Sequence, residues 1–250
     1  MGWKNILLWR VIPGILVVLA AAIGWFASHE VPMGRFFATV VPLMKGALPP
    51  TVVGHGWMKG TPPVPDDLVP KPRPKNEIFL KLPGGGKFPQ NGLGMCCRAT
   101  AYDDVLAYRT VLWYLLLGGR HIDGAHLYLN HNAIGKAIKE AVRRGVKRSE
   151  IFVTTKIAPS HYGYERAIAT VQNFLSEEEL GLDYIDLVIM HAPSFPLSTP
   201  CKREGKDAAQ CRKETWLALS DLRKKGVIKN AGVSNFGVKH LQELENIGAP

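Results

Sequence analysis

The chain has 250 residues, enough for one α/β domain and an additional segment. Its hydrophobic content of 46% and charged content of 21% are ordinary for a globular protein. The formal net charge of +10 is compatible with an anionic partner, such as a phosphorylated cofactor or an acidic membrane. The basic residues are scattered rather than gathered in a stripe with aromatic residues, which argues against nucleic-acid binding.

The first part of the chain has the pattern of a membrane anchor. Residues 11–27, VIPGILVVLAAAIGWFA, carry no charge, and Lys4 and Arg10 precede them. About 17 apolar residues is the lower limit for a helix that crosses a bilayer. We therefore expect residues 1–27 to form a transmembrane or signal-anchor helix of a single-pass membrane protein. The alternatives are a cleaved signal for an endomembrane compartment or organelle, and a buried helix of a globular fold.

Residues 28–75 are predicted to form a linker. Their second half, LPPTVVGHGWMKGTPPVPDDLVPKPRPK, is rich in proline and glycine. Proline fixes φ and removes a backbone donor, so this segment should be extended and free of regular structure.

Residues 76–250 alternate between strand and helix patterns. A hairpin with its turn at Gly84–Gly86 is expected to run into a first strand that ends at Gly94. Further strands are expected over 118–123, 150–156, 184–191 and 227–236. Helices are expected over 132–145, 162–179 with Ser160 as N-cap, 214–226 closed by Gly226, and 237–246. This order predicts an α/β fold with parallel strands and right-handed crossovers.

Polar residues stand where these strands end. They are Asp123, Lys156, His191, and the pair Ser234 and Asn235, with Tyr128 five residues after Asp123. In a (β/α)₈ barrel the carboxyl ends of the strands form the active-site face. A single buried polar residue is usually a satisfied core group, but four successive strand ends of this kind favour a catalytic site.

Five segments of the sequence resemble the aldo-keto reductase family. They are FPQNGLG, HIDGAHLYLNHNAIGKAI, IFVTTK, LDYIDLVIMH and GVSNF. The resemblance implies a TIM barrel, of which residues 76–250 would supply about the first five βα units. It also implies NADPH-dependent reduction of a small-molecule carbonyl substrate by a monomeric enzyme. The family binds the dinucleotide without a G-x-G-x-x-G motif, and this chain also lacks one.

The resemblance assigns a role to each polar residue. Tyr128 would be the general acid, assisted by the charge of Lys156, which Asp123 would hold in place. His191 would orient the substrate carbonyl. Asp123, Ser234 and Asn235 would bind the cofactor, with the latter two holding the nicotinamide carboxamide.

The sequence departs from the family in three places. His131 follows the Tyr-x-Asn triplet where the family usually has Glu, and Cys96 and Cys97 occupy positions where it often has Thr-Trp. Only five of eight strands are recognisable, and the family's contacts to the cofactor phosphates lie beyond them. We therefore expect Pro250 to end a fragment.

The four cysteines contain no C-x-x-C pair, which argues against a structural zinc site. Cys201 and Cys211 could form a disulfide in an oxidising compartment, and two free thiols are an equal alternative.

Two functions of different classes follow. The first is an NADPH-dependent aldehyde or ketone reductase that carries the full tetrad Asp123, Tyr128, Lys156 and His191. The second is a non-catalytic, membrane-anchored regulatory or interaction protein that keeps the scaffold. Turnover of NADPH with an aldehyde would separate the two.

Overall fold

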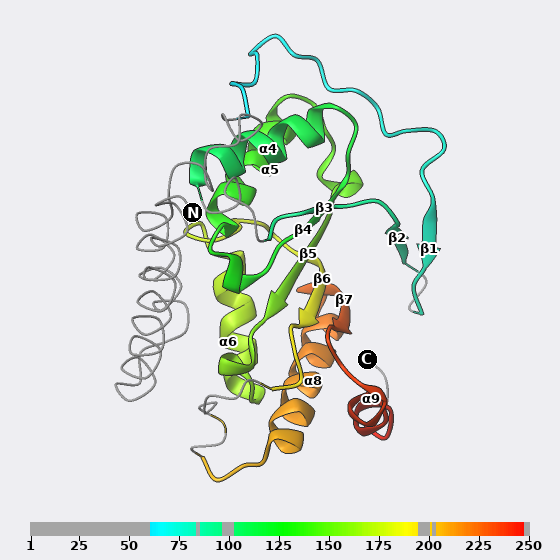
Figure 1. Cartoon of the computed structure of the whole chain (residues 1–250), viewed down its shortest axis with the longest axis vertical. Coiled ribbons are helices and arrows are strands. Elements are labelled where there is room, and N and C mark those ends of the chain that lie inside the picture. The colour runs from blue at the N-terminus through cyan, green and yellow to red at the C-terminus, as the bar shows by residue number, and fades with distance from the viewer. Residues whose placement is uncertain (1–60, 84–85, 97–102, 195–200, 202–203, 248–250) are drawn as a thin grey trace, which may run out of the picture. The chain divides into compact units, whose positions relative to one another are not determined.

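The computed structural model describes residues 61–247, except 84–85, 97–102, 195–200 and 202–203. A two-stranded antiparallel hairpin, β1 (Phe79–Lys81) and β2 (Lys87–Pro89), comes first. A five-stranded parallel sheet follows, in the order β3-β4-β5-β6-β7 (Figure 1). Its strands are β3 (Leu93–Gly94), β4 (His121–Asp123), β5 (Phe152–Ile157), β6 (Ile185–Met190) and β7 (Ile228–Val233). The predicted hairpin and the five parallel strands are thus confirmed.

Helices alternate with these strands and pack against the sheet. The described helices are α4 (Asp104–Leu116), α5 (His131–Arg143), α6 (Tyr164–Leu175), α8 (Ala208–Lys224) and α9 (Val238–Glu245). Short 3₁₀ turns lie at His126–Tyr128 (η3), Arg148–Glu150 (η4) and Pro159–His161 (η5). All six residues of β5 are buried, as expected for a central parallel strand covered on both faces. The core forms where apolar faces of the helices meet the strands, and includes Leu112, Ile134, Val171, Leu219, Ile122, Val153 and Val188.

The helix boundaries differ from the prediction for identifiable reasons. Ser160 is not the N-cap of α6, because it lies in the η5 turn and the chain extends again before the helix. Gly163 takes the N-cap position with φ of 114°, a conformation that favours glycine. Helix α8 begins before the predicted residue 214, because the side chain of Asp207 accepts a hydrogen bond from the backbone N–H of Gln210 at 2.7 Å. Gly226 follows the end of α8, as predicted.

The sequence pattern did not predict helix α4. Its β-branched and aromatic residues, such as Val111 and Trp113, are also typical of strands. The helix forms because its apolar side, including Leu112 and Leu116, is fully buried and Asp103 caps its first turn. The next strand, β4, begins at His121 rather than at the predicted residue 118.

The described part of the predicted linker contains no helix or strand over residues 61–75. It lies along α4 and α5 rather than extending freely. Lys71 N–H donates to the carbonyl of Leu116 at 2.7 Å, and the indole of Trp113 donates to the carbonyl of Pro62 at 2.9 Å. The boundaries of the three predicted segments stay a prediction.

The predicted single-pass membrane localisation must be corrected. Within the part of the chain that the structure describes, no helix has both the length and the apolar character needed to cross a bilayer. Residues 11–27, on which that prediction rested, lie outside the described residues.

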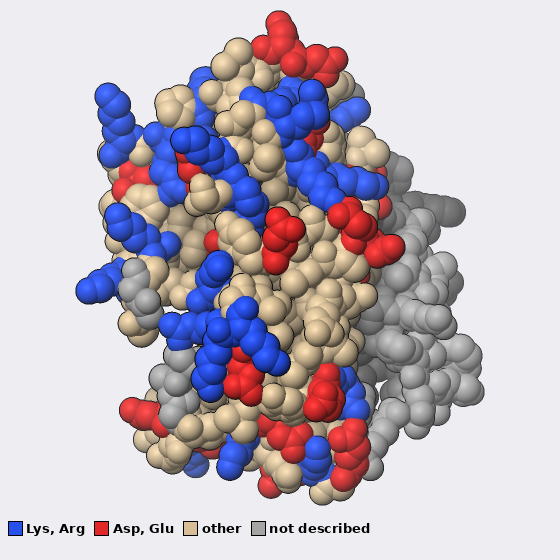
Figure 2. Space-filling model, turned by 180° about the vertical axis from the view of Figure 1, so that it is seen from behind, with Lys and Arg blue, Asp and Glu red and all other residues tan. Residues whose placement is uncertain are grey.

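Basic and acidic side chains are interspersed over the face shown in Figure 2. Several of the basic ones form ion pairs on the helices. Glu140, for example, lies 2.7 Å from both Arg143 and Arg144, which hold the pKa of its carboxyl at about 2 through hydrogen bonds and charge. Part of the positive charge is therefore neutralised locally.

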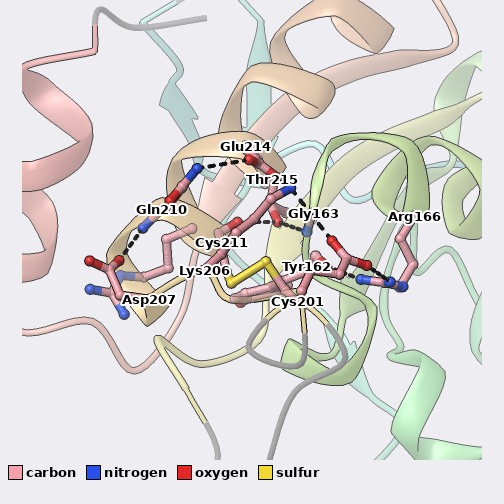
Figure 3. Close-up of a disulfide and its surroundings, with 12 residues drawn as sticks. Tyr162, Gly163, Arg166, Cys201, Lys206, Asp207, Gln210, Cys211, Glu214 and Thr215 are labelled. Atoms are coloured by element: carbon pink, nitrogen blue, oxygen red, sulfur yellow. Dashed lines mark hydrogen bonds and ion pairs between the residues drawn. A yellow bond between two sulfur atoms is a disulfide. The ribbon is translucent and has the colours of Figure 1, made fainter.

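A disulfide joins Cys201 to Cys211 and fastens the segment after β6 to helix α8 (Figure 3). Both cysteines are buried. Beside the disulfide, the N–H of Gly163 donates to the hydroxyl of Thr215 at 2.9 Å, and that hydroxyl donates to the carbonyl of Cys211 at 2.8 Å. Of the two alternatives left open by the sequence, the structure has the bridged form.

Candidate active site

The carboxyl ends of the parallel strands bring the predicted residues to one edge of the sheet. Parallel pairing sets Asp123 of β4 opposite Thr154 of β5, and Lys156 of β5 opposite Ile189 of β6. His191 directly follows β6, and its N–H donates to the carbonyl of Ile157 at 3.0 Å. The side chains at these strand ends therefore share one rim.

Asp123 and Lys156 form a close ion pair at this rim. The Lys156 Nζ lies 2.6 Å from Asp123 Oδ1 and 2.8 Å from the carbonyl oxygen of Gly124. Lys156 is only 6% exposed, and a buried ammonium is costly unless charged or polar groups partner it. The carboxylate at the end of the apolar strand β4 is therefore explained by the ammonium that it faces.

Tyr128 and His191 complete the cluster. Tyr128 lies in the η3 turn that follows β4, and the centroid of its ring is 4.9 Å from Lys156 Nζ, a cation–π arrangement. The ring centroids of Tyr128 and His191 are 5.7 Å apart, with the rings nearly perpendicular at 83°. The structure thus brings Asp123, Lys156, Tyr128 and His191 together.

His191 is held in its neutral form. Burial lowers its pKa to about 4, with a further lowering by the charge of Lys156, which the charge of Asp123 partly opposes. Its Nδ1 is buried and has no hydrogen-bond partner among the described residues. The chain beyond it is fixed, since the hydroxyl of Tyr162 donates to the carbonyl of Ala192 at 2.6 Å and Arg212 donates to the carbonyl of Pro193 at 3.1 Å.

Ser234 and Asn235 lie at the same rim, just after β7. The N–H of Ser234 donates to the carbonyl of Met190 at 2.9 Å. Asn235 Nδ2 donates to the carbonyl of His191 at 2.8 Å and lies 3.0 Å from Ser234 Oγ. Asn235 has φ of 61°, a left-handed conformation that asparagine tolerates better than most residues. All six residues named from the sequence are therefore linked by direct contacts.

A second polar cluster, formed by His131, Glu179 and Thr155, lies next to the rim residues, and the sequence analysis missed most of it. His131 Nδ1 is 2.7 Å from Glu179 Oε2, and its Nε2 is 2.7 Å from Thr155 Oγ1. The sequence singled out His131 only as a departure from the family, and neither Glu179 nor Thr155 was considered. The signal was present, because a histidine in place of the family's usual glutamate requires hydrogen-bond partners of its own where it is buried.

Comparison with known proteins identifies the family. A sequence model of the aldo/keto reductase family matches residues 84–249. The glycerol 2-dehydrogenase (NADP(+)) of Saccharomyces cerevisiae is 38% identical in an alignment 180 residues long, which covers 66% of this chain and 54% of that protein. The glyoxal reductase of Bacillus subtilis is 38% identical over 165 residues, 66% of this chain and 52% of that protein.

A solved structure gives the same result. The aldo-keto reductase of Bombyx mori in complex with NADP superposes with a TM-score of 0.58 at 30% identity, covering 70% of this chain and 55% of that one. The chain spans about half the length of the curated relatives it matches. From the family match, the parallel α/β sheet and this likeness, the chain belongs to the aldo/keto reductase family of TIM-barrel oxidoreductases.

Proposed function

We propose that the protein reduces an aldehyde or ketone to an alcohol, with NADPH as the reductant. The observation that carries the proposal is the contact chain from Asp123 through Lys156 to Tyr128 and His191. A partly buried ion pair beside a tyrosine and a neutral histidine suits the protonation of a carbonyl oxygen. Relatives whose names describe NADP-dependent or carbonyl-reducing enzymes agree with this reaction.

In this reaction Tyr128 gives its phenolic proton to the carbonyl oxygen while the carbonyl carbon accepts a hydride. The C=O bond becomes an alcohol C–O bond, and the phenolate left behind is stabilised by the nearby Lys156 ammonium. Asp123 keeps that ammonium in place. His191 is neutral at physiological pH, so it orients the carbonyl by a hydrogen bond and leaves the proton transfer to Tyr128.

The rim residues fit the nicotinamide end of the cofactor. Ser234 and Asn235 offer a hydroxyl and an amide, the groups that pair with a carboxamide. The hydrogen bond from Asn235 to the carbonyl of His191 supports this role. NADPH, when bound, supplies the hydride. Ser234 and Asn235 would hold its carboxamide, and Asp123 would lie against the nicotinamide side of the site.

The test is an assay of the purified chain with NADPH and a panel of small aldehydes and ketones. NADPH binding is followed by fluorescence and turnover by loss of NADPH absorbance. We expect carbonyl-dependent oxidation of NADPH with formation of one alcohol per NADPH. Binding without oxidation across the panel would instead favour the non-catalytic regulatory alternative.

A further inference from the structure

The two faces of strand β5 carry different polar side chains at adjacent positions. Successive residues of a strand point to opposite faces, so Thr155 points away from the face on which Lys156 meets Asp123. On that second face Thr155 Oγ1 meets Nε2 of His131, the first residue of α5. Nδ1 of the same ring meets Glu179, which lies between α6 and β6. One imidazole thus joins three separate segments.

The hydrogen-bond partners fix the orientation of the His131 ring. Burial raises the pKa of Glu179, but its hydrogen bond with His131 and the histidine's charge outweigh this effect, so the pKa lies below its ordinary value. An ionised carboxylate only accepts, so the proton on this side belongs to His131 Nδ1. On the other side of the ring, Nε2 bonds to the Thr155 hydroxyl. With both ring nitrogens bonded and the side chain 2% exposed, the ring has little freedom to turn.

The neighbouring histidines do not make this connection. The ring of His126 lies 6.3 Å from that of His131, and its Nδ1 is buried without a hydrogen-bond partner in the described part of the chain. His161 packs edge-on against His126 at 4.8 Å and bonds to the adjacent Ser160 at 3.0 Å. His126 and His161 therefore pack near His131 but do not link α5 to β5.

The two central residues of the proposed site lie close in the chain to the two residues that meet in this link. Tyr128 precedes His131 by three residues, and Lys156 follows Thr155 directly. A shift of the start of α5 relative to β5 would change the 4.9 Å separation between the Tyr128 ring and Lys156 Nζ. We propose that His131 is a positioning residue, oriented by Glu179, that holds α5 to β5 through Thr155 and thereby keeps Tyr128 over Lys156.

The experiment compares His131→Ala and the nearly isosteric Thr155→Val with a matched control, His161→Ala. His161→Ala removes a neighbouring imidazole and keeps both side chains that His131 bonds to, Thr155 and Glu179. The readout is the NMR signals of the Tyr128 ring in ¹³C-tyrosine-labelled protein, assigned with Tyr128→Phe. We expect these signals to shift in both test variants, to stay in place in His161→Ala, and to return in Thr155→Ser, which restores a hydroxyl.

A kinetic measurement shows how the variants affect carbonyl reduction, and this part rests on the proposed function. A misplacement of about 1 Å can cost roughly a hundredfold in rate. We expect kcat to fall about ten- to a hundredfold in His131→Ala and Thr155→Val, with KM for the carbonyl changed less than about twofold. His161→Ala should keep the parent kcat.

The kinetic and NMR measurements test different claims and can be contradicted independently. A parent protein that turns over no carbonyl would reject the proposed function, while the NMR comparison would still decide whether His131 positions Tyr128. Unchanged Tyr128 signals in Thr155→Val, a variant that alters only one hydroxyl, would overturn the positioning role even if His131→Ala failed to fold. Equal shifts in His161→Ala would also overturn it, because they would indicate a general loss of packing.

Discussion

The two faces of β5 hold their buried polar side chains in different ways. The rim face carries Lys156, and the helix face carries Thr155, which meets helix α5. On the rim, Lys156 is neutralised by Asp123, whose side chain is 37% exposed, and the buried Nδ1 of His191 has no partner among the described residues. On the helix face, both ring nitrogens of His131 are bonded. Burying polar groups is costly on either face, and on the rim the buried groups are the ionisable side chains of the proposed site. The His131 ring, bonded at both nitrogens, is suited to holding elements in place.

The strongest test of this contrast is Tyr128→Phe. General acid catalysis typically contributes about 10²–10⁴-fold, so kcat for carbonyl reduction should fall at least about a hundredfold. The substitution keeps the ring and its contacts with Lys156 and His191, so NADPH affinity and the melting temperature should stay near the parent values. Steady-state kinetics and NADPH fluorescence measure both. Parent-like turnover with any aldehyde would show that the rim is not the site of proton transfer.

Lys156→Met should damage both catalysis and stability. It removes the ammonium next to Tyr128 and leaves Asp123 without its cation. Breaking a fully buried pair costs about 3–5 kcal/mol, but Asp123 is partly exposed, so we expect roughly 1–2 kcal/mol. Urea unfolding measures this loss, and kcat should fall at least about tenfold. Lys139→Met, at an exposed pair on the helix surface, is the control and should change neither quantity appreciably.

Removal of the disulfide should increase local opening of the segment after His191. It should leave Thr155, on the helix face of β5, unchanged. The bridge closes a short loop with a sequence separation of 10 residues, and disulfides that close short loops typically contribute about 2–3 kcal/mol. The double variant Cys201→Ser/Cys211→Ser should lower the free energy of unfolding by that amount. Hydrogen exchange should rise in the segment after His191 and stay unchanged at Thr155. A uniform rise across both regions would contradict a local role.

The last expectation is a pH dependence of stability that both regions share. Burial is the main cause that lowers the pKa of His191 and of His161 to about 4, below their ordinary value of 6.5. The unfolded chain therefore binds protons before the folded chain does as the pH falls. Stability should be complete above pH 6.5 and decline between pH 6.5 and 4, by roughly 1–2 kcal/mol for each histidine after allowance for partial exposure.

Urea midpoints across this pH range check the expectation. Each of the variants His191→Gln and His161→Gln should reduce the loss of stability between pH 6.5 and 4. His191 lies at the rim, and His161 lies beside His126. A slope that neither substitution changes would assign the acid sensitivity to other groups.

The sequence by itself determined the succession of parallel strands along the chain and the residues of the rim. Strand patterns and the polar residue at each strand end are local features, and parallel strands necessarily align their carboxyl ends. The positions of Asp123, Lys156, His191 and Ser234 in these patterns were therefore enough to assign them to one edge of the sheet. The family resemblance added their roles. The uncharged run at residues 11–27, on which the membrane localisation rested, lies outside the described residues. Helix α4 was missed because its residues suit either helix or strand.

Only the tertiary structure decided which distant groups meet. Thr155, His131 and Glu179 lie far apart in the sequence, and nothing local indicates that one ring would bond to both other side chains. The start of α6 likewise depended on the backbone conformation of Gly163 rather than on the better capping residue Ser160. Such contacts arise from how helices pack on the sheet, where burial forces each polar atom to find whichever partner the packing brings within reach.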